Sequence, residues 1–313
     1  MTVRLLAPAK LNLCLTIGAR RSDGYHDLET LFERIDLADE LTFDVRDGSL
    51  EVICEHAELD GGPDNLVTKA ARLLQSSAGA KQGAAIHLTK WVPVASGLGG
   101  GSSDAATTLI GLNRLWQLGL STERLCDLGA ELGSDVPFFL YQTGFAIGRG
   151  RGERCEPLRE PLPTLRHVLV VPDQRLSTSQ VYQGLDEARA RGRFLTASAP
   201  LTTMCLHALR NGSLGELAKG MANELEPEAI RRCPVIQEIK ANLRDSGCVH
   251  ALTSGSGSAV FGLCRDLSHA EQVIARLRSK LPTQWLLRVV STHPESVSLE
   301  VPANRPVPSG RGA

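Results

Sequence analysis

The chain has 313 residues, of which 42% are hydrophobic, 22% charged and 4% aromatic, and its formal net charge is -1. This length predicts about two domains, and the lack of a basic excess or of aromatic stacking platforms argues against a nucleic-acid-binding protein. The eight cysteines include no Cys-x-x-Cys pair and no apolar run is long enough for a signal peptide or a membrane span, so we expect a cytoplasmic protein with reduced thiols.

The first predicted strand spans 11–17, where every odd position is apolar and the even positions are smaller or more polar. Lys10 and Asn12 lie on the opposite face from these apolar residues, because side chains alternate along a strand. Two polar side chains on one face can line a cleft or face solvent, and this segment alone does not decide between them.

Tyr25 and His26 follow an Asp-Gly turn signal at 23–24, which places a phenol ring and an imidazole together on a loop. His26 can serve as an acid or base or, as lone histidines more often do, as a hydrogen-bonding group. Further on, 41–45 and 50–54 are predicted as two strands that pair with each other around a second Asp-Gly turn.

A glycine-rich loop dominates the middle of the first half. The stretch 96–103 holds four glycines and three serines between a predicted strand, 86–92, and a predicted helix that begins near 105 and stops at Gly119. Glycines let a backbone approach a phosphate closely, and a helix N-terminus offers unpaired N–H groups with a partial positive charge. This order predicts a nucleotide phosphate site, with a flexible loop as the alternative. It fits neither a Walker A loop nor a Rossmann fingerprint.

Asn65 and Ser121 each precede an amphipathic pattern and are predicted helix N-caps. The helix after Ser121 ends near Gly133, and Asp135 follows in the run Leu-Gly-Ser-Asp-Val-Pro. A carboxylate in this position can face a cleft or cap a helix, and both interpretations stay open at this point.

The second half begins after three prolines within 156–164, which predict the connection between two domains. Beyond them we expect a buried strand at 167–172, the start of a helix at 177–185, and two further helices around 214–225 and 235–243. A second loop of small residues, 253–258, precedes another strand, and the tail 296–313 is predicted to be disordered.

Three of these stretches, 8–13, 93–106 and 253–258, resemble in order and content the three motifs of the GHMP small-molecule kinase superfamily. The runs Arg-Arg-Ser-Asp-Gly-Tyr-His-Asp-Leu and Leu-Gly-Ser-Asp-Val-Pro-Phe-Phe narrow the resemblance to members that act on a cytidine diphosphate alcohol. The resemblance implies an α+β fold of two domains with the active site in the cleft between them. The implied parts are a GHMP ATP-binding domain at 1–160, a C-terminal GHMP domain at 161–295 and the tail at 296–313.

The resemblance also implies the reaction, in which the γ-phosphoryl group of ATP passes to the 2-hydroxyl of a methylerythritol moiety. Lys10 and Asp135 match the catalytic pair of the family: Asp135 would accept the hydroxyl proton, while Lys10 favours the developing alkoxide and keeps the carboxylate ionised. Mg²⁺ is implied beside ATP, with Ser102 or Ser103 as its ligand. The implied ATP-binding residues are Asn65, Lys90, Pro93, Val94, Ala95, Ser96, Gly97, Leu98, Gly99, Gly100, Gly101, Ser102, Ser103 and Asp104. The implied substrate-binding residues are Asn12, Tyr25, His26, Thr178 and Tyr182.

The implied partner is the small-molecule substrate, without nucleic acid or membrane, and we expect a monomer or a weak homodimer. The alternatives are a GHMP kinase for homoserine or mevalonate, an ATP-dependent decarboxylase of the same superfamily, and an RNA-binding module. Tyr25 and His26 suit a flat base better than a small aliphatic acceptor, and the balanced charge argues against RNA.

Overall fold

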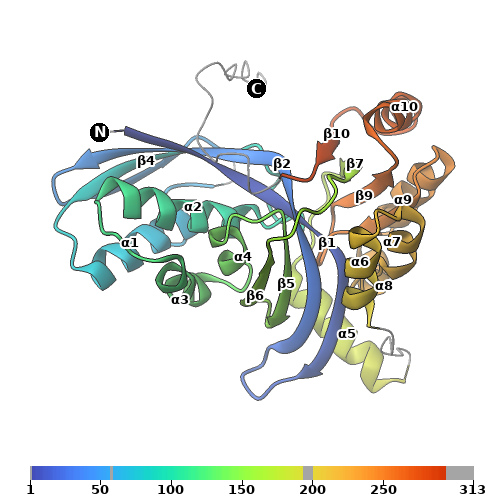
Figure 1. Cartoon of the computed structure of the whole chain (residues 1–313), viewed down its shortest axis with the longest axis horizontal. Helices are drawn as coiled ribbons and strands as arrows, with labels where there is room; N and C mark the ends of the chain where they lie inside the picture. Colours follow the sequence, from blue (N-terminus) through green and yellow to red (C-terminus); the bar gives the residue numbers. More distant parts are fainter. Residues whose placement is uncertain (1, 57–58, 193–199, 294–313) are drawn as a thin grey trace.

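The computed structural model describes residues 2–56, 59–192 and 200–293, which form two β-sheets covered by helices (Figure 1). The tail that is predicted to be disordered, 296–313, lies outside these residues. No helix in the described part of the chain is long and apolar enough to cross a membrane.

The larger sheet is built around one long strand, β2. Its strands are β1 Thr2–Arg20, β2 His26–Arg46, β3 Leu50–Cys54, β4 Gly83–Thr89, β5 Phe145–Gly150 and β6 Arg154–Leu158. β1 runs antiparallel along one edge of β2, while β4 and β5 pair with different halves of the other edge. Helices α1 Leu66–Ala78, α2 Gly100–Leu115, α3 Thr122–Leu132 and α4 Val136–Leu140 cover one face of this sheet, and Phe32, Phe43, Leu109 and Phe138 lie in the apolar core between them.

The smaller sheet has four antiparallel strands in the order β10-β7-β9-β8. They are β7 Arg166–Val171, β8 His250–Thr253, β9 Val260–Cys264 and β10 Leu286–Ser291. The helices of this part are α5 Thr178–Ala190, α6 Leu201–Arg210, α7 Leu214–Gly220, α8 Glu226–Arg232, α9 Val235–Asp245 and α10 Leu267–Leu277. The predicted α+β class is confirmed.

The predicted helix starts hold, but one strand pairing does not. The side chains of Asn65 and Ser121 accept hydrogen bonds from the N–H groups of Val67 and Arg124, as N-caps do. The pairing predicted between 41–45 and 50–54 is wrong, because β4 lies between β2 and β3. β3 runs parallel to β4, with α1 as the connection between them.

Two predicted boundaries are also wrong, and in both places the residues that follow bond to other segments of the chain. The strand predicted at 86–92 ends at Thr89, because the N–H groups of Trp91 and Val92 donate to the Asp39 carboxylate at 2.5 and 2.8 Å. The helix predicted at 214–225 ends at Gly220. Beyond it the Asn223 amide donates to two carbonyls of the 253–258 loop, at 2.9 and 2.7 Å.

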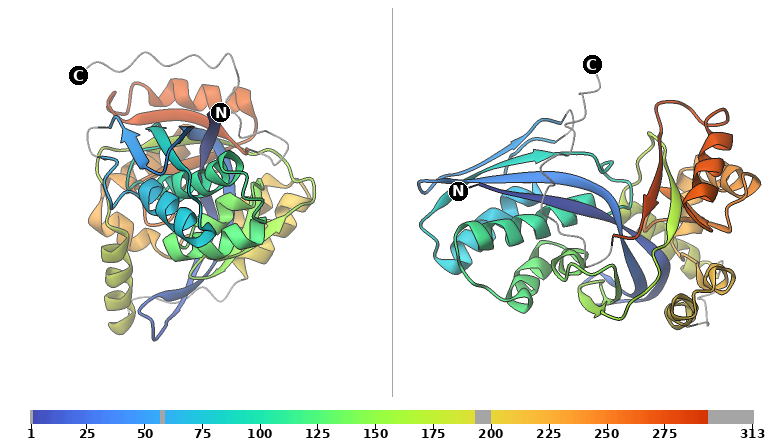
Figure 2. Two further views of the ribbon diagram at one scale, coloured as in Figure 1. Left: turned by 90° about the vertical axis from the view of Figure 1, so that its left-hand side faces the viewer. Right: turned by 45° about the horizontal axis from the view of Figure 1, so that its top comes forward.

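β1 is buried on both faces, so the solvent-facing alternative for Lys10 and Asn12 is wrong. Its first half packs against α2, whereas Leu15 and Ile17 belong to a core that they share with α5, α8 and α9. Figure 2 shows β1 and β2 bending out of the larger sheet toward the second part of the chain. The domain division at 160 stays a prediction. β1 contacts elements that precede residue 160, such as α2, and elements that follow it, such as α6.

The loop 93–99 is hydrogen-bonded to the second small-residue loop, 253–258, and to the residue that follows it. The Ala259 N–H donates to the Ser96 carbonyl at 2.9 Å, and the Ser254 hydroxyl donates to the Gly97 carbonyl at 3.0 Å. Gly97 has a φ of +84°, and a Cβ there would lie 2.2 Å from the Ser254 carbonyl oxygen. Only glycine fits this crossing point.

Replacing Gly97 with alanine is therefore expected to lower the free energy of unfolding by about 3 kcal/mol or more, because the backbone strain adds to a backbone clash. Gly119→Ala is the matched control, since Gly119 has a φ of +66° and open space around its Cβ position. The free energy of unfolding of Gly119→Ala should fall by only about 1 kcal/mol. Urea unfolding of both variants measures the difference, and equal losses would contradict the close approach of the two loops.

Candidate active site

A cavity of about 1200 Å³ is lined by residues from both halves of the chain. It is bordered by β1, the hairpin end at 24–26, the loop 93–99, the start of α2, the turn before α4, α5 and the loop at 255–256. Every residue predicted for the site lines this cavity except Ser103. The prediction that these distant segments meet in space agrees with the structure.

Lys10 and Asp135 face each other across the middle of the cavity. Lys10 Nζ lies 3.7 Å from Asp135 Oδ2 and donates to Asn12 Oδ1 at 2.5 Å. The Lys10 side chain is 5% exposed and that of Asp135 is 30% exposed, so the lysine is fixed from behind while the carboxylate is open to the cavity. Burial lowers the pKa of Lys10, and the nearby Asp135 carboxylate opposes that shift.

Asn12 and Thr30 hold the lysine in place. The Asn12 amide donates to Thr30 Oγ1 at 2.9 Å, and the Thr30 hydroxyl donates to the Cys14 carbonyl at 2.6 Å. The Lys10 backbone N–H donates to the Leu98 carbonyl at 2.9 Å, which ties β1 to the glycine-rich loop. Lys10 is thus positioned through both its side chain and its backbone.

The glycine-rich loop turns into helix α2 earlier than predicted. The helix begins at Gly100 after the left-handed Gly99, and the first intrahelical bond runs from the Ser103 N–H to the Gly99 carbonyl at 2.9 Å. The N-cap residue, Gly99, has no side chain to cap this end, and the N–H groups of residues 100–102 have no partner within the helix because they belong to its first turn. A Cβ on Gly99 would lie 3.0 Å from Lys10 Cγ and 3.1 Å from Phe139 Cζ. The result is a helix N-terminus beside Lys10, which is an arrangement that suits an anion.

Of the two serines considered for Mg²⁺, only Ser102 lines the cavity. Ser103 is completely buried, and its hydroxyl has no hydrogen-bond partner among the described residues. Because the Ser103 side chain is buried in the protein and does not line the cavity, Ser102 is the one of the two that stays a candidate ligand. No group of three or more His, Cys, Asp or Glu side chains is placed to hold a metal within the described ranges.

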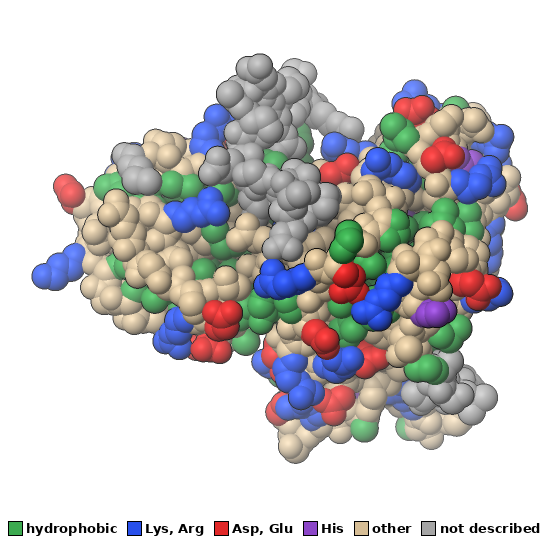
Figure 3. Space-filling view, in the orientation of Figure 1, with side chains coloured by type: hydrophobic (Ala, Val, Ile, Leu, Met, Phe, Trp, Pro, Cys, Tyr) green, Lys and Arg blue, Asp and Glu red, His purple; other side chains and the backbone are tan. Residues whose placement is uncertain are grey.

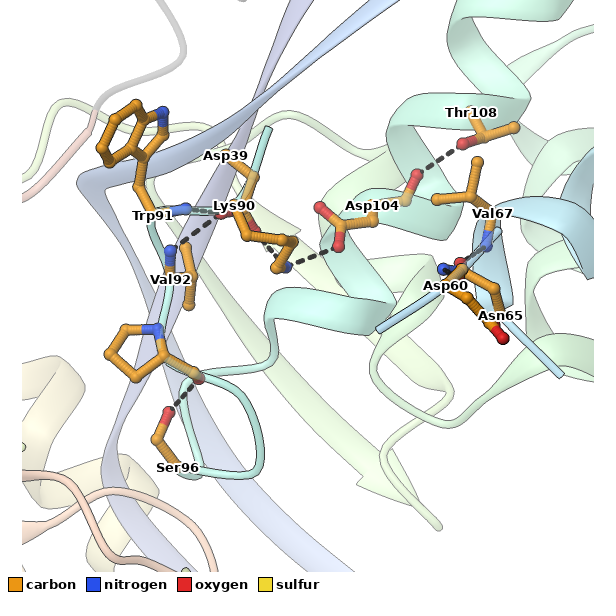
Figure 4. Close-up of polar contacts among 11 residues, drawn as sticks. Asp39, Asp60, Asn65, Val67, Lys90, Trp91, Val92, Ser96, Asp104 and Thr108 are labelled. Atoms are coloured by element: carbon orange, nitrogen blue, oxygen red, sulfur yellow. Dashed lines mark hydrogen bonds and ion pairs between the residues drawn. The ribbon is translucent and has the colours of Figure 1, made fainter. Parts of the chain in front are cut away.

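Lys90 sits between two buried carboxylates, as Figure 4 shows. Its ammonium contacts Asp39 and lies 2.6 Å from Asp104 Oδ2. Burial would lower the pKa of Lys90, but the two carboxylates outweigh it and raise that pKa. Burial and the neighbouring Asp39 carboxylate raise the pKa of Asp104 well above its usual range, against the attraction of Lys90. Lys90 is predicted to lie near adenine. Its ammonium also joins β2, through Asp39, to the first turns of α2, through Asp104.

Aromatic and charged side chains from the β1–β2 hairpin, α5 and the turn after β5 line another part of the cavity. Tyr25 is 52% exposed, and the Arg151 guanidinium lies over its ring at 4.8 Å. His26 and Tyr182 lie with ring centroids 5.2 Å apart, and His26 Nε2 is 2.7 Å from Asp186 Oδ1. Burial raises the pKa of the Tyr182 hydroxyl. This part of the cavity offers flat rings together with hydrogen-bonding groups.

Thr178 lies where α5 meets the second loop, because its hydroxyl is 2.9 Å from that of Ser256. Asp135 occupies the N-cap position of α4, yet its side chain makes no capping bond. The carboxylate is thus available to the cavity, and helix capping is not its role.

The cavity residues that were not found from the sequence include Arg20, Arg151 and Asp186. Asp186 follows Tyr182 by four residues in a predicted helix, so helical spacing could have placed both on one face. Arg20 and Arg151 carried no usable signal, because their positions depend on how the hairpin and β5 approach each other.

Two family models match the chain: the GHMP kinases N terminal domain over residues 65–143 and the GHMP kinases C terminal domain over residues 205–283. A 4-diphosphocytidyl-2-C-methyl-D-erythritol kinase of Pelotomaculum thermopropionicum is 42% identical over 283 residues, which cover 89% of this chain and 94% of that one. One from Moorella thermoacetica is also 42% identical, covering 91% of this chain and 98% of that one. The chain belongs to the GHMP kinase family. It is accordingly a small-molecule phosphotransferase that uses ATP.

Solved structures agree with this membership of the GHMP kinases. The crystal structure of a 4-(cytidine 5'-diphospho)-2C-methyl-D-erythritol kinase matches with a TM-score of 0.75 and 36% identity, covering 92% of this chain and 98% of that one. A homoserine kinase from Cytophaga hutchinsonii matches with a TM-score of 0.72 at 18% identity, covering 94% of this chain and 95% of that one. The second match shows the shared fold alone.

Substituting Lys90 with methionine should destabilise this GHMP kinase by about 3–5 kcal/mol, because it leaves two carboxylates buried without their shared cation. Lys69→Met is the control, since Lys69 pairs with the fully exposed Asp64 and should change stability little. Thermal and urea unfolding measure both variants. If Lys90→Met proved as stable as the wild type, the buried ion cluster would not be holding α2.

Proposed function

We propose that this GHMP kinase transfers the γ-phosphoryl group of ATP to the 2-hydroxyl of 4-diphosphocytidyl-2-C-methyl-D-erythritol. The observation that carries the proposal is the 3.7 Å approach of Lys10 and Asp135 between an anion-binding helix start and an aromatic end of the same cavity. The proposal is supported by two relatives that carry this enzyme name and are 42% identical to the chain over most of its length.

Asp135 is the proposed general base. Its carboxylate is open to the cavity and can accept the proton of a hydroxyl placed beside it as that oxygen attacks phosphorus. The Lys10 ammonium, fixed by Asn12, stabilises the negative charge that develops on the attacking oxygen and on the phosphoryl group. Because the fold fixes both groups, little reorganisation is needed during transfer.

The proposed phosphate site is formed by residues 96–102, and within it Ser102 is the proposed Mg²⁺ ligand. The N–H groups of 100–102, which have no partner within the helix, and the partial positive charge of α2 favour the β- and γ-phosphates. A serine hydroxyl facing the cavity suits Mg²⁺, which takes oxygen ligands, keeps several waters and draws others from the nucleotide phosphates. When bound, Mg²⁺ neutralises phosphate charge.

The two ends of the cavity are assigned to the two bases. We place adenine near Asn65 and Lys90, where Leu59, Leu66 and Leu88 supply an apolar lining. Cytosine is placed with Tyr25, His26 and Tyr182, because stacked rings and an imidazole suit a flat base that also forms hydrogen bonds. Asn12 and Thr178 would lie along the substrate between the base and the reacting hydroxyl.

Other parts of the proposal concern partners and location. Figure 3 shows Lys and Arg mixed with Asp and Glu on the face in view, which supports a protein without a nucleic-acid partner. The monomeric or weakly dimeric state and the cytoplasmic location stay predictions, the latter supported by eight unpaired cysteines.

A substrate panel tests the function. Purified protein with ATP and Mg²⁺ should phosphorylate 4-diphosphocytidyl-2-C-methyl-D-erythritol and neither homoserine nor mevalonate. Phosphorylation of homoserine or mevalonate without the cytidine substrate would reject the proposal. Release of carbon dioxide from a diphosphorylated acid would instead indicate a decarboxylase, and salt-dependent RNA binding without transfer would indicate an RNA-binding module.

Asp135→Asn is expected to lower kcat by about 10²- to 10⁴-fold, because the amide cannot accept the hydroxyl proton. ATP affinity, measured by titration calorimetry, should stay nearly unchanged. Asp127→Asn removes a carboxylate from the exposed face of α3 and serves as the control with unchanged turnover. Normal turnover of Asp135→Asn would show that another group accepts the proton.

Tyr25→Ala should raise KM for the cytidine substrate about tenfold or more through lost stacking, while KM for ATP stays the same. Tyr141→Ala is the control, because Tyr141 lies outside the cavity. Steady-state kinetics with each substrate varied in turn separates the two constants. An effect confined to ATP would place the adenine, rather than the cytosine, at Tyr25.

A further inference from the structure

Helix α5 presents one face to the hairpin formed by the end of β1 and the start of β2, and Figures 1 and 2 show the two side by side. Tyr182, Asp186 and Arg189 are spaced by four and three residues, so they share this face. Tyr182 lies against His26, and Asp186 Oδ1 is 2.7 Å from His26 Nε2. Arg189 donates to the carbonyls of residues 17 and 18 at 2.6 and 2.9 Å. The helix and the hairpin therefore hold His26 jointly.

The contact with Asp186 determines where His26 carries its proton. An ionised carboxylate only accepts hydrogen bonds, so the bonded Nε2 carries the hydrogen. In a neutral imidazole the remaining nitrogen, Nδ1, is then an acceptor. The described part of the chain supplies no hydrogen bond to Nδ1. Arg20 Nη1 lies 4.0 Å from the second oxygen of Asp186, so this carboxylate is held between the imidazole and a guanidinium.

We infer that Asp186 is a positioning residue that makes His26 Nδ1 an acceptor for the exocyclic amino group of cytosine, and so sets a preference for cytidine over uridine substrates. This inference rests on the proposed function, which places cytosine with Tyr25, His26 and Tyr182. Uracil carries a carbonyl where cytosine carries its amino group. Two acceptors would then face each other, and a site that leaves buried polar groups unpaired rejects the ligand.

The side chains that surround His26 favour this role. Its imidazole is 5% exposed, with Tyr182 packed against the ring and Asp186 at its edge, so it cannot turn freely. Asp186 is 31% exposed and contacts the ring rather than the centre of the cavity at Lys10 and Asp135. It therefore acts on base recognition through His26 and takes no part in phosphoryl transfer.

Asp186→Asn is the test, because an amide can donate as well as accept and so frees His26 to take either tautomer. We expect KM for the cytidine substrate to rise about tenfold or more, with kcat and KM for ATP unchanged. The ratio of kcat/KM for the cytidine substrate to that for its uridine analogue should fall by a similar factor. Asp186→Glu, which keeps a carboxylate, should recover part of this ratio.

Glu187→Gln is the matched control. Glu187 neighbours Asp186 on α5, but its exposed carboxylate interacts with Gln183 and Arg191 and does not line the cavity. The substitution removes one negative charge from the same helix and should leave the cytidine-to-uridine ratio unchanged. An equal change in both variants would overturn the inference, because the effect would then come from the charge of the helix.

Nitrogen-15 NMR of His26 in the free protein measures directly which imidazole nitrogen carries the proton, and a loss of structural support alone would not change this. The wild type and Glu187→Gln should show a protonated Nε2 and an unprotonated Nδ1, whereas Asp186→Asn should lose this pattern. A wild-type Nδ1 that carries the proton, or a cytidine-to-uridine ratio unchanged in Asp186→Asn, would overturn the inference. If the wild type failed to phosphorylate the cytidine substrate at all, the proposed function would fall, and the NMR comparison would still show whether Asp186 sets the tautomer.

Discussion

The cavity depends on the approach of three backbone segments to one point. β1 at Lys10, the loop at 96–99 and the loop at 254–257 are joined by hydrogen bonds between residues that are far apart in the chain. Glycines at 97 and 99 allow this approach, since a Cβ at either would meet a neighbouring segment. Lys10 therefore lies against the start of α2, and a phosphate bound there would already be next to the cation.

Electrostatics around this point follow from which charges are buried and with what partners. Lys10 is buried with Asn12 and a single open carboxylate, so its environment favours an arriving anion. Lys90 is buried between two carboxylates and already has its counter-charges. The two lysines line one cavity, and they differ in that Lys90 has two buried carboxylates beside it while Lys10 has one that is open to the cavity. Lys90 instead joins β2, the turn after β4 and α2.

Local patterns in the sequence were enough for part of this. The N-caps at Asn65 and Ser121, the glycine-rich loop that leads into a helix and the mixed α+β class follow from glycine, capping residues and periodicity. The catalytic pair was assigned through the family resemblance, because a lysine on a strand and an aspartate on a turn have no local signal for their meeting. Contacts that join residues 51 and 160 positions apart, Asp39 with Lys90 and His26 with Asp186, have none either. The parallel pairing of β3 with β4 was missed because the Asp-Gly turn signal at 47–48 suggested a hairpin, and no local pattern indicated that β4 lies between β2 and β3.

A structure with a non-hydrolysable ATP analogue and the cytidine substrate bound together tests the central claim most directly. The account predicts the triphosphate at the start of α2, cytosine at Tyr25 and His26, and the 2-hydroxyl within hydrogen-bonding distance of Asp135 and in line with the γ-phosphorus. A hydroxyl that pointed away from Asp135, or adenine at the Tyr25 end of the cavity, would contradict it.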